Sequence, residues 1–390
     1  MNTSHDDPTG RAARAALTAL AEPGDRLLNA LIERAGPPGA LGAVRSGTLP
    51  DGVARTAEDQ HRALARLEHW RLRLSAVDTD ADLAVAERLG VRLVCPGDPE
   101  WPTTLDDLGD ERPYALWLRG PRDLRHGCLR SVAIVGARGA TSYGTRIAAD
   151  LAARLAETDW TIVSGGALGI DAAAHRGALA ADGRTFAVLA NGVDVPYPAV
   201  HEGLFAELAG RGLLVSESPP GASPRRSRFL VRNRVIATLT RGTVVVEAAW
   251  RSGALNTASW AQRLDRELMA VPGPVDSAAS EGCHRLLRDS PPALLVTRPE
   301  EVVEALGRLG DDLAPPPRDP VLPRDRLDPA TRAVLEALPA RGHAGPAQLA
   351  ATAGMSLDAV NAKLGLLAAA GFVERSPGGW RLTTTARGRA

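Results

Sequence analysis

The chain of 390 residues has only three cysteines, Cys95, Cys128 and Cys283. They lie far apart and form neither a Cys-x-x-Cys pair nor a cluster with histidines, which excludes the usual spacing of a structural zinc site. So low a cysteine content also agrees with a reducing compartment, where disulfides are rare. The sequence therefore predicts no metal, and none of its patterns requires a cofactor.

Long apolar runs are missing as well. No segment is apolar over the length that spans a bilayer, and the first residues lack the apolar core of a signal peptide. With 44% hydrophobic and 24% charged residues, the composition is typical of a soluble globular protein. We therefore expect a cytoplasmic protein without membrane contacts.

Net charge is absent too, because 46 basic residues balance 46 acidic ones. The cations are nevertheless unevenly distributed: the segment from Ser218 to Arg241 has no acidic residue and six arginines, namely Arg225, Arg226, Arg228, Arg232, Arg234 and Arg241. Guanidinium groups bind phosphate through two parallel hydrogen bonds. A solvated face with scattered ion pairs is the alternative, but the run itself holds no acidic partner. The segment predicts a site for a polyanion.

Four segments follow one another along the chain, as expected for a length that exceeds one hydrophobic core. Residues 1–90 show apolar positions at helical spacing and predict an N-terminal helical domain. Residues 91–306 alternate short apolar stretches with helical patterns, and residues 307–328 form a Pro-rich linker. Residues 329–390 predict a small separate domain.

The second segment determines the fold class. Near-continuous Val, Ile and Leu stretches occupy residues 132–135, 161–163, 185–189, 213–216, 244–246 and 268–271. Helical patterns separate them, at residues 146–158, 171–181, 199–209, 229–240 and 254–264. This alternation predicts an α/β protein with a doubly wound, extended Rossmann-type parallel sheet that is covered on both faces.

Two glycine-rich loops follow successive predicted strands. The first runs from Gly136 to Gly139 and contains Arg138, and the second contains Ser164, Gly165, Gly166 and Gly169. Ligands of open parallel sheets bind beyond the carboxyl ends of the strands, where helix N-termini attract negative charge. The full Gly-x-Gly-x-x-Gly dinucleotide pattern is absent. These loops predict phosphate contacts without predicting a dinucleotide cofactor.

The arginine run follows a later strand of the same sheet. Arg232, Asn233 and Arg234 lie on its predicted helix, where the arginines are expected to hold phosphates and the asparagine a base or a phosphate. Aromatic residues make up only 4% of the chain, and Phe229 and Tyr197 are the candidates for base stacking. A core position for Phe229 is an equal alternative.

The order of these loops resembles the DprA family, also called Smf. The resemblance covers residues 92–304 and rests on Gly136-Ala137-Arg138, Ser164-Gly165-Gly166, Gly169-Ile170-Asp171 with His175, Asp194 with Tyr197-Pro198, Ser216-Glu217, Arg232-Asn233-Arg234, Glu247-Ala248, Ser252-Gly253-Ala254-Leu255 with Thr257-Ala258, and Pro272-Gly273. It implies a non-enzymatic protein that binds single-stranded DNA, protects it, and loads the recombinase RecA onto it during natural transformation. It also implies a homodimer, with single-stranded DNA-binding protein as a further partner.

One departure from the family pattern concerns Leu168, which stands where the family often has a lysine or arginine before Gly-Ile-Asp. One phosphate contact is therefore missing, and the affinity for DNA is expected to depend more strongly on Arg138, Arg232 and Arg234.

The main rival is a Rossmann-type hydrolase that acts on nucleoside monophosphates. Glu247 at a strand end and Thr257 on the next helix would suit that reaction, but the Pro-Gly-Gly-x-Gly-Thr loop of such hydrolases is absent. Asp171 and His175 lie four residues apart on one helix and resemble a catalytic pair. A capping aspartate and a packed histidine are the preferred interpretation, so no catalytic residue is assigned.

The last segment predicts a winged helix, with three helices followed by two strands around Ser376-Pro377-Gly378. Ser356 is expected to cap the third helix. The outer face of that helix offers Asp358, Asn361 and Ala362, with Lys363 as its only cation. Protein docking and weak DNA binding both remain open for this domain.

Overall fold

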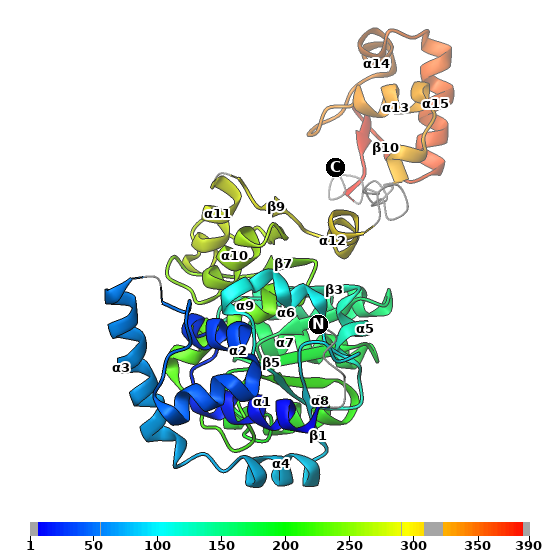
Figure 1. Cartoon of the computed structure of the whole chain (residues 1–390). Coiled ribbons are helices and arrows are strands. Elements are labelled where there is room, and N and C mark those ends of the chain that lie inside the picture. Colours follow the sequence, from blue (N-terminus) through cyan, green and yellow to red (C-terminus); the bar gives the residue numbers. More distant parts are fainter. Residues whose placement is uncertain (1–6, 55, 290, 308–322, 385–390) are drawn as a thin grey trace. The chain divides into compact units, whose positions relative to one another are not determined.

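The structure is a computed structural model that describes residues 7–54, 56–289, 291–307 and 323–384 (Figure 1). The chain forms two compact units, Met1–Ala314 and Pro315–Ala390. Within the predicted linker, residues 308–322 lie outside the described part of the chain. Among the described residues, no helix has both the length and the apolar character needed to cross a membrane.

A nine-stranded sheet, counted over the described residues, forms the centre of the first unit, in the order β1-β2-β6-β5-β4-β3-β7-β8-β9. The strands from β3 onward run parallel, whereas β1 and β2 are antiparallel to their neighbours. Strand β3 (Ser131–Val135) lies between β4 (Thr161–Ser164) and β7 (Gly242–Val245). The strand order reverses there, which confirms the predicted doubly wound topology.

All six strands predicted in the central segment are present, with bounds within two residues of those expected. The remaining strands of the sheet are β1 (Val91–Val94), β2 (Leu116–Arg119), β5 (Thr185–Leu189), β6 (Leu213–Ser216), β8 (Glu267–Ala270) and β9 (Leu294–Leu295). Every residue of β3 to β7 is buried, because helices cover both faces of the sheet. This explains why these strands read as continuous apolar runs.

The helices form one layer on each face. The core that contains Val132 and Ile134 is closed by α6 (Ser142–Glu157), α7 (Ile170–Ala180) and α12 (Pro299–Leu306). The opposite core, with Ala133 and Val135, is closed by α9 (Arg226–Thr238), α10 (Ala254–Arg263) and α11 (Glu281–Arg288). The other helical segments here are η1 (Thr103–Glu111), α5 (Leu124–Cys128), η2 (Ala199–His201), α8 (Glu202–Arg211) and η3 (Ala278–Ser280).

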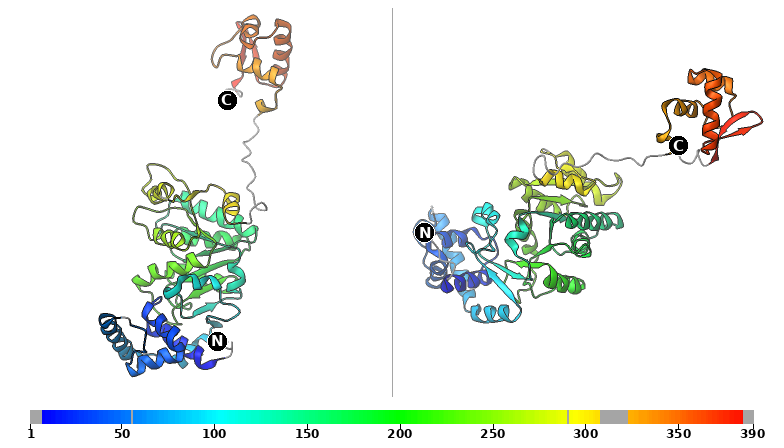
Figure 2. Two further views of the ribbon diagram at one scale, coloured as in Figure 1. Left: turned by 45° about the horizontal axis from the view of Figure 1, so that its top comes forward. Right: turned by 90° about the vertical axis from the view of Figure 1, so that its right-hand side faces the viewer.

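The N-terminal helices form a further layer at one end of the sheet. They are α1 (Pro8–Leu20), α2 (Arg26–Ser46), α3 (Ala57–Leu74) and α4 (Thr79–Arg88). The first three share an apolar core of their own, whereas α4 packs against the core beside β1. The indole Nε1 of Trp117 on β2 donates to Thr18 Oγ1 at 3.1 Å, which joins this layer to the sheet. Figure 2 shows these helices in blue at the end opposite to α11 and α12. The domain boundary predicted at residue 90 stays a prediction, since the helices belong to the same compact unit as the sheet.

The second unit contains a 3-10 turn, three helices and a hairpin. The elements are η4 (Pro323–Arg326), α13 (Pro329–Glu336), α14 (Pro346–Ala353), α15 (Leu357–Ala369), β10 (Val373–Ser376) and β11 (Gly379–Leu382). Ser356 caps α15 as expected, its hydroxyl accepting from the Ala359 N–H. Lys363 forms an ion pair with Asp328 at 3.1 Å. The order of elements is the one predicted, while the winged-helix assignment remains an interpretation.

Candidate nucleic-acid interface

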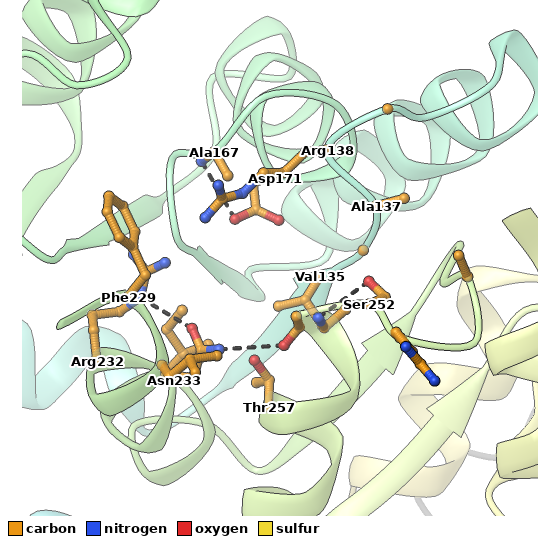
Figure 3. Close-up of a pocket in the computed structure, with 18 of the residues that line it drawn as sticks. Val135, Ala137, Arg138, Ala167, Asp171, Phe229, Arg232, Asn233, Ser252 and Thr257 are labelled. Atoms are coloured by element: carbon orange, nitrogen blue, oxygen red, sulfur yellow. Dashed lines mark hydrogen bonds between the residues drawn. The ribbon is translucent and has the colours of Figure 1, made fainter. Parts of the chain in front are cut away.

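A pocket of about 540 Å³ opens at the carboxyl ends of β3 and β7 (Figure 3). Its walls are the loop after β3 (residues 136–139), the first turns of α9, and the loop after β7 (residues 249–253). Ala167 and Asp171 close it from the side of β4. This is the point at which the strand order reverses, where open α/β sheets bind their ligands.

Two of the predicted phosphate-binding glycines bring the pocket loops together. Gly169 has a φ of +76°, and a Cβ there would lie 2.3 Å from the carbonyl oxygen of Ala137. A Cβ on Gly136 would lie 2.5 Å from Cγ1 of Ile170, and the Ile170 N–H donates to Ala137 O at 3.2 Å. Both glycines are therefore needed for close packing of the two loops, which sets the position of Arg138.

The loop after β4 supports the pocket from inside. The N–H groups of Gly165 and Ala167 donate to Oδ2 of Asp171 at 3.1 and 3.4 Å, and the Ser164 hydroxyl donates to Ile134 O at 2.7 Å. Ser164, Gly165 and Gly166 are buried, and none of them lines the pocket. The donors of Ser164 and Gly165 are thus occupied within the chain, and the predicted contacts of these three residues with phosphate stay predictions.

Asp171 and His175 are not a catalytic pair. Asp171 holds the loop before its helix, whereas His175 is fully buried and its Nδ1 lies 2.7 Å from Thr185 Oγ1. The Thr185 hydroxyl donates to Ile162 O, so His175 Nδ1–H is the donor to Thr185. The predicted packed histidine is thus confirmed.

Arg232 lies beneath the pocket with only 6% of its surface exposed. Its Nη1 donates to Gly165 O at 2.8 Å and also to Val188 O. Burial lowers the pKa of Arg232 to about 10, while the charge of Asp171 acts in the opposite direction. Arg232 thus lines the pocket, but its Nη1 holds the loop after β4, and its predicted phosphate contact stays a prediction.

Arg234 does not reach the pocket. It is fully buried. Its Nη1 donates to Oε1 of Glu217 and its Nη2 to Oε2, both at 2.7 Å, and its Nε donates to Glu111 O at 2.8 Å. The prediction that Arg234 contacts DNA is corrected by this burial. Sequence reasoning missed the interaction because Glu217 stands just before the arginine run.

Two further arginines of the run have an acidic partner from the loop between α1 and α2. Arg225 and Arg228 both bind Glu22, at 2.9 and 2.6 Å. Burial raises the pKa of Glu22, but the hydrogen bond and charge of Arg228 outweigh it, so the pKa is lowered overall. The acidic partners that the run lacks therefore come from other parts of the chain.

Three guanidinium groups remain available at the pocket. Arg138, Arg226 and Arg251 line it and are exposed, and no ion pair is present for any of them within the described part of the chain. They come from three separate elements: the loop after β3, the start of α9 and the loop after β7. Sequence reasoning counted Arg226 in the arginine run without giving it a phosphate contact, and it missed Arg251. The signal for Arg251 is its position directly before Ser252-Gly253 at a strand end.

The aromatic candidates lie beside Arg138. The guanidinium carbon of Arg138 is 5.2 Å from the centre of the Phe229 ring, and the ring centres of Phe229 and Tyr197 are 5.5 Å apart. Figure 3 shows Arg138 and Phe229 extending toward each other across the pocket. Phe229 is half-buried and Tyr197 is 42% exposed. Arg138, Phe229 and Tyr197 therefore form a row with surface left for a further planar group.

Asn233 contributes to the pocket floor. Its Nδ2 donates to Asn256 Oδ1 at 3.2 Å and to Gly253 O at 3.4 Å, which joins α9 to α10. Only 8% of the residue is exposed. Its predicted contact with a base or phosphate stays a prediction.

Glu247 holds Thr141, the N-cap residue of α6. Its carboxylate accepts from the Thr141 N–H at 2.9 Å and from the Thr141 hydroxyl at 2.6 Å, and it is 2% exposed. It thus takes the place at the helix N-terminus where a Rossmann-type protein binds the phosphate of a nucleotide. In this geometry the carboxylate of Glu247 is hydrogen-bonded to Thr141, which argues against the catalytic role that the rival hydrolase would give it.

Comparison with known proteins agrees with this architecture. The family model for DNA recombination-mediator protein A matches residues 92–307. The putative DNA processing protein DprA of Mycobacterium tuberculosis is 44% identical over 395 residues, which covers 98% of this chain and 97% of that protein. The DNA processing protein DprA of Streptococcus pneumoniae is 38% identical over 206 residues, covering 53% of this chain and 71% of the relative.

The fold is matched by the X-ray structure of DNA processing protein A from Streptococcus pneumoniae. That structure superimposes with a TM-score of 0.61 at 28% identity and covers 77% of this chain and 99% of its own. The segment matched by the family model includes every residue that lines the pocket. The chain is therefore a member of the DNA recombination-mediator protein A family, the DNA-processing proteins also called DprA and Smf.

Proposed function

We propose that this protein binds single-stranded DNA in the pocket at the sheet edge. The observation that carries the proposal is the convergence of Arg138, Arg226 and Arg251, three exposed guanidiniums without an ion pair among the described residues, around one pocket. Such groups bind phosphates with charge-assisted hydrogen bonds. Contacts to the DNA backbone position the strand without reading its sequence.

The aromatic row favours a single strand over a duplex. Phe229 lies between Arg138 and Tyr197, and a base can stack on such a row only after it has left its neighbours in a helix. Stacking tolerates every base, because each has a planar face. The expected ligand is therefore single-stranded DNA of any sequence.

Family membership supports a proposal for a wider role. We propose that the protein protects incoming single strands and loads RecA onto them during natural transformation or recombination. It acts in the cytoplasm as a homodimer, with single-stranded DNA-binding protein as a second partner. These partners are proposed from membership of the family, and no surface of this chain is assigned to them.

Fluorescence anisotropy with a labelled oligothymidine at several salt concentrations tests the DNA site. For three phosphate contacts we expect the slope of log affinity against log salt to be about −2, at roughly −0.7 per contact. Arg138→Ala, Arg226→Ala and Arg251→Ala should each weaken binding about tenfold or more and reduce the slope by about 0.7.

Arg88→Ala is the matched control for these variants. Arg88 is an exposed arginine on α4, which packs at the β1 end of the sheet, and its removal should leave binding unchanged. Wild-type affinity in all three pocket variants would contradict the site. Turnover of a nucleoside monophosphate by the wild type would favour the hydrolase instead.

A further inference from the structure

A tight turn after β7 carries an exposed tryptophan. The Ser252 N–H donates to Ala249 O at 3.0 Å, so Trp250 and Arg251 occupy the two central positions of a β-turn, whose side chains project from its tip. Trp250 is 53% exposed, whereas Trp70, Trp101, Trp117 and Trp160 are at most 2% exposed. A tryptophan ring is usually buried in the core of a protein, so an exposed tryptophan at the tip of a loop indicates a contact surface.

The turn is held firmly by α11. The Gly282 N–H donates to Ala248 O at 2.7 Å, and a Cβ on Gly282 would lie 2.6 Å from the same oxygen. The guanidinium carbon of Arg285 on this helix lies 5.1 Å from the centre of the Trp250 ring. This cation–π contact orders the ring, while about half of the residue stays exposed to solvent.

The turn also forms one wall of the DNA pocket. Ala249 and Arg251, the two neighbours of Trp250 in the chain, both line it. Tyr197 follows β5 and Trp250 follows β7, and these strands are separated by β4 and β3. Neighbouring strands lie about 4.8 Å apart, so the carboxyl ends of β5 and β7 are separated by roughly 14 Å along the sheet edge. The pocket lies between these two strand ends.

We propose that Trp250 is a second base-stacking subsite for single-stranded DNA. The inference rests on the proposed function and extends it. A strand that leaves the pocket past Arg251 stacks one unpaired nucleobase on the exposed surface of the indole, and Arg251 binds the adjacent phosphate. The ligand class is an unpaired nucleobase of any identity, because every base presents a planar face.

Anisotropy titrations of the full chain with oligothymidines of increasing length test the subsite. Trp250→Ala should weaken binding of long oligonucleotides by about 5- to 150-fold, the range measured for one stacked base. It should leave unchanged the affinity for oligonucleotides too short to leave the pocket. The salt dependence should also stay unchanged, because stacking releases no counterions.

Two variants and one modified ligand make the test specific. Trp250→Phe should keep most of the affinity, and Leu72→Ala, at an exposed apolar residue on α3, should have no effect. Scanning an abasic nucleotide along a long oligonucleotide should reveal one position that weakens the wild type but not Trp250→Ala. A residue that only stabilised the fold would show no such dependence on position.

The outcomes separate this inference from the proposed function. If Trp250→Ala binds long oligonucleotides like the wild type, the subsite is wrong, while the pocket site remains supported by its own arginine variants. If the wild type binds no single strand, the proposed function fails first. Loss of self-association in sedimentation with unchanged DNA affinity would show that Trp250 contacts protein, and would overturn the inference.

Discussion

Arg234 and Glu217 form a two-point ion pair inside the protein, with both N–O distances at 2.7 Å. Their surfaces are 0% and 7% exposed, and the pair joins the middle of α9 to the end of β6. An arginine in the middle of a basic segment thus belongs to the interior. Its charge is neutralised locally and contributes little to the field that a DNA strand meets.

The first prediction concerns this pair. Arg234→Ala should lower the free energy of unfolding by about 3–5 kcal/mol, because it leaves the carboxylate of Glu217 buried without its partner. Urea unfolding measures the loss. Arg226→Ala, at an exposed position of the same helix, should change stability by no more than about 0.5 kcal/mol. Wild-type stability of Arg234→Ala together with weakened DNA binding would restore the role predicted from the sequence.

The second prediction concerns Phe229. Phe229→Ala should weaken binding of oligothymidine by about 1–3 kcal/mol, because it removes the stacking surface between Arg138 and Tyr197. The slope of affinity against salt should not change, since no phosphate contact is lost. Phe229→Tyr should bind like the wild type. Equal affinities of the alanine variant and the wild type would place Phe229 among the core residues.

The fold was predictable from the sequence because its signals are local. The strands β3 to β8 are each four or five residues long and rich in apolar residues, and helical patterns separate them, so element order and fold class follow from short windows. The site edge was predictable too, since the carboxyl ends of parallel strands share one side of the sheet. Arg138 and Phe229, which line the pocket, were placed at this edge in this way, while their contacts with DNA stay predictions.

The individual contacts were harder to predict, because they depend on partners distant in the chain. Glu22 binds Arg228 across 206 positions, and Glu247 binds Thr141, the N-cap of α6, across 106. Neither interaction has a signature in a short window. Arg226 and Arg234 therefore look equivalent in the sequence, although α9 begins at the exposed Arg226 and has entered the interior by Arg234.

The third prediction concerns the response of stability to pH. Burial, with the nearby charges of His201, Arg232 and Arg176, lowers the pKa of His175 from 6.5 to about 3. Its Nε2 has no hydrogen-bond partner, so protonation would bury a cationic N–H without an acceptor. The native state thus binds fewer protons than the unfolded state between pH 3 and 6.5. The stabilisation is complete above pH 6.5 and is lost as the pH falls through that window.

Urea unfolding at pH 7.5 and pH 5.0 measures this effect. The wild type should lose about 2 kcal/mol more than His175→Gln between the two conditions, at roughly 1.4 kcal/mol for each of the 1.5 pH units below 6.5. Other groups that titrate in this range are common to both proteins and cancel in the difference. An equal loss in the two proteins would mean that His175 is protonated in the folded state as readily as in the unfolded one.

The fourth prediction compares two glycines of neighbouring pocket loops. A Cβ on Gly169 meets the carbonyl oxygens of Ala137 and Arg138 at 2.3 and 2.6 Å, and its φ is +76°. Gly139, by contrast, has no atom within 4 Å of such a Cβ. Gly169→Ala should therefore destabilise the protein by more than about 1 kcal/mol and displace the backbone that carries Arg138. Gly139→Ala should be neutral or stabilise by about 0.4–1 kcal/mol, because it restricts the unfolded chain.

DNA binding distinguishes this packing role from direct phosphate contact. If the glycines act by packing, Gly169→Ala weakens oligothymidine binding through Arg138, so the variant loses little further affinity when Arg138→Ala is added. If the backbone of Gly139 approaches a phosphate directly, Gly139→Ala weakens binding although it leaves stability intact. A double-mutant cycle of Gly169→Ala with Arg138→Ala tests the packing role, because residues that act through one contact are not additive. Additive losses would show that the loop containing Gly169 meets DNA independently of Arg138.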